Sequence, residues 1–389
     1  MAFEAPPVPR LPYWAMVWSH LNNDALANYL PGILPAIAVA RHIPLLLLGS
    51  LVTALTLGQA LQPLAGMWSD RIGGRRLVLA GILLAALATF GVSYAPTYPL
   101  LAGSLFLTGL GSTIYHPQAL AVTRTLGQGR AGVSMSGFLV GGEAGRALGP
   151  LAAGLVVALA GLTHLWLLAV PLLLTWLWLR AEVPSLPRRQ GPSPKIDWSR
   201  HARPATSLLL FTTLRAASVA ALVTFVPLIY RAEGGSLVAG ASLVTTLIGV
   251  GVAGNLAGGA VRDRLGAAPV LWASTALAIL AAAALTQASG AWMWVVLAVL
   301  GIAVFSTGPI TILLGQDIFT ENPALGSGIA LGLGNGLGAL ALLPLSYLAQ
   351  SAGLGAGLWA VVVLGALSML AVPALVKVGR PAVPLAPHF

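Results

Sequence analysis

The sequence predicts an all-α membrane protein of twelve transmembrane helices in two six-helix bundles with pseudo-two-fold symmetry. Composition indicates the membrane class, because only 8% of the 389 residues are charged and 57% are apolar, whereas a typical soluble domain is about 25% charged. Breaks rich in Pro and Gly divide the chain into twelve apolar runs. A helix needs about 20 apolar residues to cross the hydrocarbon layer, so each run is a candidate span.

The breaks also place the expected helices and domains. The twelve spans are expected at 13–40, 44–67, 76–95, 98–123, 131–160, 163–181, 205–231, 237–261, 269–289, 291–316, 326–351 and 354–377. Residues 182–204 form the longest polar, proline-rich stretch. We expect this stretch to be a cytoplasmic linker between an N-terminal bundle (1–181) and a C-terminal bundle (205–389).

A charged turn that occurs twice indicates that the two bundles arose by duplication. The first copy is residues 66–76 (GMWSDRIGGRR), and the second is residues 259–266 (GAVRDRLG), 193 residues later. Further matches pair Pro117 with Pro309 and Pro150 with Pro344, at offsets of 192 and 194 residues. Repeats of this kind are a feature of transporters, in which the cargo site lies at the repeat interface.

The distribution of basic residues predicts the orientation. If the N-terminus is cytoplasmic, sixteen of the twenty basic residues fall in cytoplasmic segments, and the outer loops carry only Arg41 and Arg231. By the positive-inside rule both termini are then cytoplasmic. The net charge of +10 is therefore a topology signal, and we expect no nucleic-acid partner.

Several classes of chemistry are not expected. The chain has no cysteine, which excludes disulfides and thiolate metal sites. It also has no His-x-x-x-His or Gly-x-Ser-x-Gly pattern, so we expect no enzyme, no cofactor and no metal. The expected partners are a small-molecule substrate, protons and the lipid bilayer, and the expected state is a monomer.

The first charged turn resembles the loop 2–3 motif of the major facilitator superfamily. The motif G-x-x-x-D-R-x-G-x-R-R is matched at all six positions, namely Gly66, Asp70, Arg71, Gly73, Arg75 and Arg76. The resemblance implies a transporter that works by alternating access. It also implies a cytoplasmic latch between the halves, formed by Gly66, Asp70, Arg71, Gly73 and Arg75 together with Arg124.

Three further segments resemble the fosmidomycin-resistance branch of that superfamily. They are residues 19–24 (SHLNND), 115–117 (YHP) and 141–150 (GGEAGRALGP). The resemblance implies export of a small molecule, with a fosmidomycin-like phosphonate as one possibility, although Glu143 and Arg146 depart from the residues of that branch. Residues 145–154 also resemble the helix-five motif of drug/proton antiporters, and a kinked, closely packed helix explains the same residues equally well.

Four charged residues are expected near the bilayer midplane: Asp24, Glu143, Arg146 and Arg215. A charge at the centre of a transmembrane helix costs roughly 2.5–3.5 kcal/mol, so each needs a partner or water. Glu143 and Arg146 are three residues apart and can form an ion pair, or they can act in coupling and in substrate binding. Arg215 has no carboxylate within reach on its own helix, so we expect it to meet Asp24, Glu143 or an anionic substrate.

The polar residues around these charges are candidates for the site. His20 lies four residues before Asp24 and thus on the same helical face. A carboxylate beside an imidazole can hold or release a proton, so the pair is either a proton-coupling site or a polar patch of the cavity wall. His116 either bonds within the kink at Pro117 or contacts cargo, and Asn23 is a candidate for substrate binding.

These residues predict a proton-coupled secondary transporter that exports a small molecule or drug. Protonating one of the buried carboxylates frees an arginine, which favours an uptake symporter for an organic anion as the alternative. A non-transporting membrane receptor is a remote third reading, because only about a dozen residues follow Lys377.

Overall fold

The N-terminal half is a bundle of helices in the computed structural model, which describes residues 10–62, 64–65, 74–126, 131–182, 196 and 198–378. Its longer helices are α1 (Arg10–Asn28), α3 (Leu45–Ala60), α5 (Gly74–Tyr94), α6 (Tyr98–Leu126), α7 (Ala131–Ala160) and α8 (Val170–Glu182). Three shorter elements extend them: the 3-10 helices η1 (Leu30–Ile33) and η2 (Leu162–Ala169), and helix α2 (Leu34–Arg41).

The C-terminal half repeats this plan with more interruptions. Its elements are α9 (Trp198–Ala232), α10 (Leu237–Leu265), α11 (Ala267–Leu285), α12 (Trp292–Ser306), α13 (Gly308–Ile318), α14 (Pro323–Gly328), the π-helix η3 (Ile329–Leu333), α15 (Gly334–Ala352), α16 (Leu354–Met369) and α17 (Val372–Val378). Helix α9 begins at Trp198, so residues 198–204 are helical although the sequence placed them in the linker.

The described elements group into twelve helical passages, which confirms the predicted architecture. Five passages are composite: α1–η1–α2, η2–α8, α12–α13, α14–η3–α15 and α16–α17. Within the described residues, 8 helices are long and apolar enough to cross a membrane, or 9 if the bent pair α16–α17 is one span. Helices α1 and α6 are absent from that set because they carry the polar residues of the site described below.

Proline and glycine explain where the passages break. Pro31 and Gly32 lie in the short 3-10 turn that separates α1 from α2. Pro309 lies just after Thr307, where α12 gives way to α13. A proline lacks the N–H that continues the helical ladder, so each break falls at or near such a residue. The chain bends by 42° between α16 and α17, next to Pro373.

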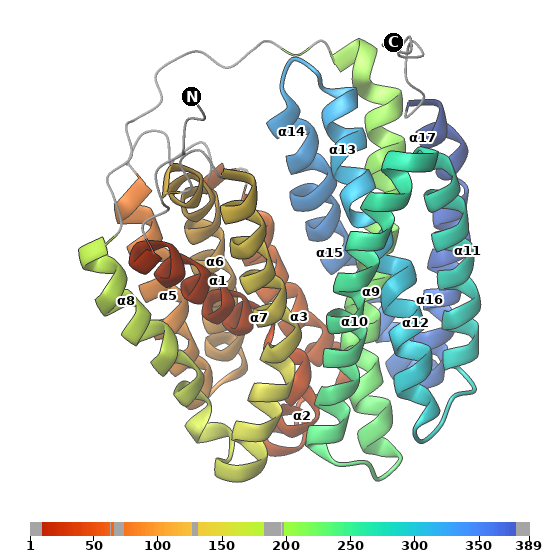
Figure 1. The fold of residues 1–389 in the computed structure, drawn as a ribbon. Helices are drawn as coiled ribbons and strands as arrows, with labels where there is room; N and C mark the ends of the chain where they lie inside the picture. The colour runs from red at the N-terminus through yellow and green to blue at the C-terminus, as the bar shows by residue number, and fades with distance from the viewer. Residues whose placement is uncertain are drawn as a thin grey trace.

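The two bundles lie side by side and meet mainly at the end away from the chain termini (Figure 1). Helix α7 packs on α10, and α3 packs on α15. The hydroxyl of Thr53 donates to the carbonyl of Ala339 at 2.7 Å, and the amide of Leu46 donates to Gln350 at 2.9 Å. At the opposite end, where α1 begins and α17 ends, the ribbons of the two halves diverge (Figure 1).

The outer surface is apolar, as a lipid-facing surface must be. Large side chains remain exposed on helices of both halves, among them Leu159 (85%), Leu256 (71%) and Trp292 (69%). Polar side chains are instead buried between helices: Ser19, Asn23 and Thr108 are each 0% exposed. Helices satisfy their own backbone groups in lipid, which leaves the buried side chains as the source of specific chemistry.

Candidate functional site

A cluster of two histidines and one aspartate lies between α1 and α6 in the N-terminal bundle. His116 Nε2 is 3.0 Å from Asp24 Oδ1, and His20 Nε2 is 3.6 Å from Asp24 Oδ2. The two Nε2 atoms are 3.3 Å apart. Asp24 is 3% exposed and His20 is 4% exposed, so a charge here has little water to solvate it. We call His20, Asp24 and His116 the His–Asp–His cluster.

Hydrogen bonds to backbone carbonyls fix which nitrogen of each histidine faces the carboxylate. His20 Nδ1 lies 2.8 Å from the carbonyl oxygen of Phe138, and His116 Nδ1 lies 2.7 Å from that of Ser112. A carbonyl oxygen only accepts hydrogen bonds, so both Nδ1 atoms carry hydrogen. In the neutral rings both Nε2 atoms are then bare acceptors that face each other and Asp24. The cluster is therefore short of hydrogens and has a strong demand for at least one proton.

Asn23 and Ser112 hold the carboxylate and the second histidine in place. Asn23 Nδ2 donates to Asp24 Oδ1 at 3.1 Å and to Ser112 Oγ at 3.0 Å, and Ser112 Oγ lies 3.2 Å from His116 Nδ1. Asn23 is 0% exposed. The side chain that the sequence suggested for substrate binding therefore supports Asp24 in this conformation.

Helix α7 positions His20 through glycine and a phenylalanine. The imidazole stacks on the ring of Phe138 with centroids 4.0 Å apart. A Cβ atom at Gly142 would overlap the same imidazole, and one at Gly145 would overlap the carbonyl of Leu21. Small residues let helices approach closely in lipid. The glycine-rich segment at 141–150 thus brings α7 against α1, which agrees with its interpretation as a packing motif.

The cluster is also the one group of at least three His, Cys, Asp or Glu side chains in the described residues with the spacing of a metal site, its ligand atoms all lying within 4.8 Å of one another. The amide of Asn23 and His116 already meet at the same oxygen, Asp24 Oδ1, so a metal bound there would displace a hydrogen bond. The short contacts therefore fit shared protons better than a metal ion.

Glu143 and Arg146 form the ion pair that their spacing allows. Arg146 Nη1 lies 3.3 Å from Glu143 Oε1 on α7, and the two side chains are 37% and 27% exposed, respectively. The charge of Arg146 also acts on Asp24, His20 and His116. The pair therefore lies close enough to the cluster for its charges to act on it, and the pair is more exposed to solvent than the cluster is.

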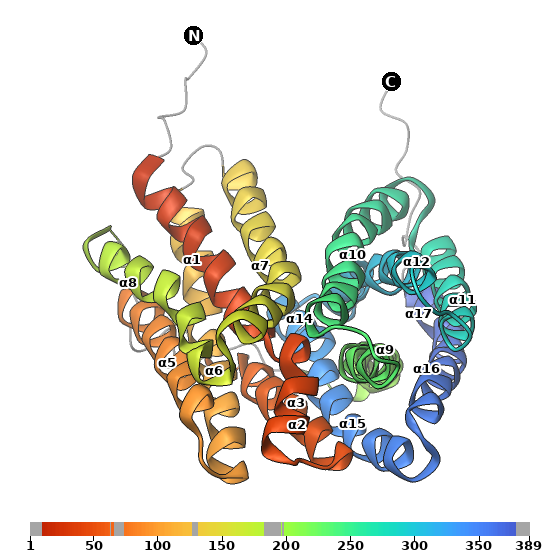
Figure 2. The ribbon, with the colours of Figure 1, turned by 90° about the horizontal axis from the view of Figure 1, so that it is seen from below.

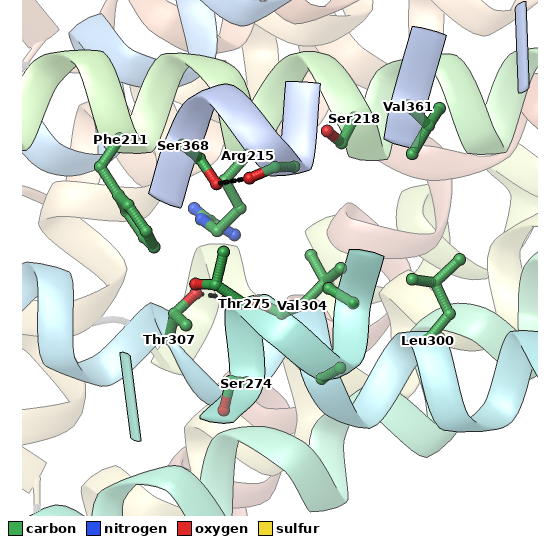
Figure 3. A pocket seen from close by; sticks show the side chains of 13 residues that line it. Phe211, Arg215, Ser218, Ser274, Thr275, Leu300, Val304, Thr307, Val361 and Ser368 are labelled. Carbon is green, nitrogen blue, oxygen red and sulfur yellow. Dashed lines mark hydrogen bonds between the residues drawn. The ribbon is translucent and has the colours of Figure 1, made fainter. Parts of the chain in front are cut away.

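Arg215 is placed differently from the expectation that it meets Asp24 or Glu143. It makes no ion pair and no hydrogen bond with any residue that the structure describes, and its Nε is buried without a partner. Its guanidinium lies in a pocket inside the C-terminal bundle, among α9, α11, α12 and α16 (Figure 3). The fold thus turns Arg215 away from the carboxylates, because α9 directs residues 211, 215 and 218 into its own bundle.

Most of the predicted latch lies outside the described residues: Gly66, Asp70, Arg71 and Gly73. Arg75 lies at the start of α5 and donates a hydrogen bond to the carbonyl of Arg180 on α8. Arg124 is exposed near the end of α6. In the second repeat, Arg262 Nη2 lies 3.8 Å from Asp317 Oδ2, which joins the ends of α10 and α13.

The sequence analysis missed four residues that build the cluster: Ser112, Tyr115, Phe138 and Gly142. Ser112 lies one helical turn before His116, and this spacing could have revealed it. Tyr115 meets the hydroxyl of Ser19 at 2.6 Å beside the histidines. The roles of Phe138 and Gly142 depend on the packing of α7 against α1, which no local spacing predicts.

The fold and the cluster define a class: a multi-pass membrane protein with two helical bundles and a buried polar site. The profile of the Major Facilitator Superfamily matches residues 19–342. The chain belongs to this superfamily, as the charged turn suggested, and its substrate class is therefore a small molecule.

Curated relatives and solved structures agree with this family. The chain is 25% identical to the uncharacterized MFS-type transporter YfnC of Bacillus subtilis (strain 168), over 90% of both chains. It is 26% identical to the fosmidomycin resistance protein of Escherichia coli (strain K12), over 86% of both. A bacterial homologue of the human lysosomal transporter Spinster, inward-facing and unoccupied, superposes with a TM-score of 0.78 and 15% identity over 97% of this chain and 99% of that one. The nucleoside transporter NupG gives a TM-score of 0.73, with 14% identity over 95% of this chain and 99% of that one.

Proposed function

We propose that this chain is a proton-coupled secondary transporter that exports a small molecule by alternating access, with a fosmidomycin-like phosphonate as the first cargo to test. The observation that carries the proposal is the His–Asp–His cluster. Its two Nε2 atoms and the two oxygens of Asp24 are four acceptor atoms that lie within 3.6 Å of their neighbours, and both Nδ1 atoms are already used as donors. Such a cluster takes up a proton and gives it away when its surroundings change.

Burial explains why the proton matters for the transport cycle. A fully ionised Asp24 without a proton nearby is an uncompensated charge in a low-dielectric site, which is costly. Loading a proton onto the cluster removes that cost and changes how the two bundles pack around it. His116 has the most exposed side chain of the three, at 19%, so we assign it as the point at which protons enter and leave.

Cargo recognition is assigned to the more open groups beside the cluster. Arg146 and Glu143 are partly exposed, and the guanidinium can bind a phosphonate or carboxylate by donating two parallel hydrogen bonds. Because the charge of Arg146 also acts on Asp24, an anion bound there and a proton on the cluster influence each other. This linkage couples the two sites, and its sign, in which a bound anion favours the proton, is the one that the symporter alternative requires.

The energy of one proton is sufficient for useful export. A charge that crosses 100 mV releases about 2.3 kcal/mol, and one pH unit adds about 1.4 kcal/mol. Together these support a cargo gradient of the order of a hundredfold. We place both termini in the cytoplasm on the basis of the distribution of basic residues, and we propose a monomer in the bacterial cytoplasmic membrane.

The test uses purified protein in proteoliposomes with labelled fosmidomycin and a pH-sensitive dye in the lumen. For an exporter that exchanges cargo for protons, an acidic lumen drives uptake of the drug into the vesicle, and the dye reports loss of protons. We expect Asp24→Asn to abolish this uphill uptake while exchange of labelled for unlabelled drug continues. Glu233→Gln, which makes the same change at an exposed carboxylate, is the matched control.

Two results separate the proposal from its rivals. Uphill uptake driven by an alkaline lumen indicates an uptake symporter for an organic anion, the alternative that a partly exposed arginine beside a proton site favours. Undiminished proton-coupled flux in Asp24→Asn shows that the cluster is not the coupling site. Chelator in all buffers keeps metal ions from the three side chains.

A further inference from the structure

The interior of the C-terminal bundle contains a small cavity with an unusual wall. It is lined by residues of α9, α11, α12 and α16 and by Thr307, and it has a volume of about 30 Å³. Its wall is mostly apolar, with one cation and a few hydroxyl groups. Figure 3 shows the guanidinium of Arg215 with Ser368 on one side and Thr275 and Thr307 on the other.

The cation in this wall has no counter-charge among the described residues. A guanidinium presents five N–H donors, and Arg215 makes no hydrogen bond or ion pair with any part of the chain that the structure describes. The cavity lining in that part of the chain includes no carboxylate. The charge that acts on Arg215 is that of Arg146, which is also positive. The Nε atom of Arg215 is buried without a partner, and a buried polar group without a partner is costly, so the chemistry of the wall favours an anion.

A second buried donor faces the same cavity. Thr275 is 5% exposed and its hydroxyl has no hydrogen-bond partner in the described residues. The hydroxyls of Ser218, Thr307 and Ser368 donate to carbonyls of their own helices, and hydroxyls can rotate toward a new acceptor. Arg215 and Thr275 are therefore two independent side chains whose free donors meet in one cavity.

We propose that the C-terminal bundle binds a small inorganic anion, of the size of chloride, between Arg215 and Thr275. The cavity volume sets the size of the ligand. A space of about 30 Å³ exceeds the 10–15 Å³ or so that one water needs, but it does not hold a cargo molecule. The anion neutralises Arg215 and lowers its repulsion with Arg146 across the two halves.

The residues that line this site differ from those of the His–Asp–His cluster and of the Glu143–Arg146 pair. All residues that line it belong to α9, α11, α12, α16 and Thr307, whereas the His–Asp–His cluster lies between α1 and α6. The anion is thus a fixed ligand of one bundle and not the cargo. We expect Asp24→Asn to lose proton coupling and still to bind the anion. A failure of one proposal therefore does not imply a failure of the other.

The test measures chloride binding directly, by the broadening of the ³⁵Cl NMR signal of dilute chloride with purified protein in detergent and gluconate as the balancing anion. We expect the wild-type protein to broaden the signal and Arg215→Gln to lose most of that effect. Arg231→Gln, at another arginine of the same helix that bonds the carbonyl of Gly235, is expected to broaden it like the wild type. Thr275→Val, which keeps the shape and removes the hydroxyl, is expected to weaken binding several-fold.

Thermal unfolding supplies the second readout. A ligand that binds only the folded state raises Tm with its concentration, so replacing gluconate by chloride is expected to raise the Tm of the wild type and of Asp24→Asn by a few degrees, and not that of Arg215→Gln. Equal broadening by wild type and Arg215→Gln means that the cavity holds only water. Displacement of chloride by fosmidomycin assigns Arg215 to the cargo. Either result overturns the proposal.

Discussion

In the N-terminal half, a carboxylate, two imidazoles and their supporting amide meet between two helices, and each charge of this site has a partner within hydrogen-bond or ion-pair distance. In the C-terminal half, one arginine lies in a cavity without a partner among the described residues. The halves share a helical plan, with α1 equivalent to α9 and α6 to α12–α13. At the offset of 192 to 194 residues that relates them, Asp24 corresponds to residues 216–218 (Ala, Ala, Ser) and His116 to 308–310 (Gly, Pro, Ile).

The difference indicates that the two halves of a duplicated fold carry different polar groups at equivalent positions. A proton site in both bundles would put two sets of titrating groups on the same interface. At the positions equivalent to Asp24 and His116, the C-terminal half instead has a hydroxyl and small or apolar residues. Figure 2 shows α9 end-on with α10, α12, α16 and α15 around it, and Arg215 on this helix lines a cavity formed by residues of its own bundle. Under the proposed function, the N-terminal half titrates and the C-terminal half responds.

The largest expected effect comes from a single methyl group beside the cluster. Gly142→Ala would push a Cβ into the imidazole of His20, which is also stacked on the ring of Phe138 and bonded to its carbonyl. We expect at least a tenfold loss of proton-coupled uptake in proteoliposomes, together with a stability loss of about 1–3 kcal/mol from overpacking.

Gly259→Ala in the other half is the control, because a Cβ there meets no described atom within 4 Å. We expect it to transport like the wild type. If Gly142→Ala kept the full coupled rate while folding normally, His20 would not need its present position and the cluster would lose its assigned role.

Local spacing was enough for part of this arrangement. The charged turn that begins at Gly66 predicted the family, and the Pro and Gly breaks predicted the twelve passages. The i,i+4 and i,i+3 spacings predicted that His20 lies beside Asp24 and that Arg146 lies beside Glu143. These contacts lie within one helix, so the helical period alone determines them.

The rest depends on how helices are rotated against each other. His116 is 92 residues from Asp24 in the chain, and its contact follows from the packing of α6 against α1. Arg215 meets neither of the two carboxylates that the sequence offered as its partners, because hydrophobic pattern gives no direction on a helix that is buried on most sides. Packing of small residues such as Gly142 and Gly145 sets these rotations, and the sequence carries no local record of it.

The prediction of intermediate size concerns Arg146, the paired cation of the N-terminal half, which contrasts with the unpaired cation of the C-terminal half. Arg146→Gln removes the proposed cargo contact, so we expect a several-fold rise in KM for fosmidomycin in proteoliposomes. Glu143→Gln leaves that contact and is expected to change KM by less than about twofold.

The ion pair itself is partly exposed, and a double-mutant cycle on unfolding should give a coupling energy below about 1 kcal/mol. A larger coupling with unchanged KM in both variants would mark the pair as structural.

The smallest effect concerns a second histidine–carboxylate pair, in the C-terminal half. His201 Nε2 lies 2.6 Å from Glu321 Oε1, at the end of the bundle where the chain termini lie and not at its centre. The backbone N–H of Glu321 and the imidazole of His201 hold the pKa of Glu321 below its usual range. A lowered carboxyl pKa stabilises the fold above the unfolded pKa, and this contribution disappears as pH falls through the folded pKa.

We therefore expect Glu321→Gln to lower Tm slightly at pH 7, and this difference from the wild type to shrink as pH falls below the usual glutamate pKa of about 4.3. Proton-coupled uptake is expected to stay within twofold of the wild-type rate, because this pair is at the rim and Glu321 is 33% exposed. The same chemistry at Asp24 is expected to control transport. If Glu321→Gln lowered the coupled rate as far as Asp24→Asn does, position in the bundle would not decide which half carries the proton. The comparison between the two halves would then fail.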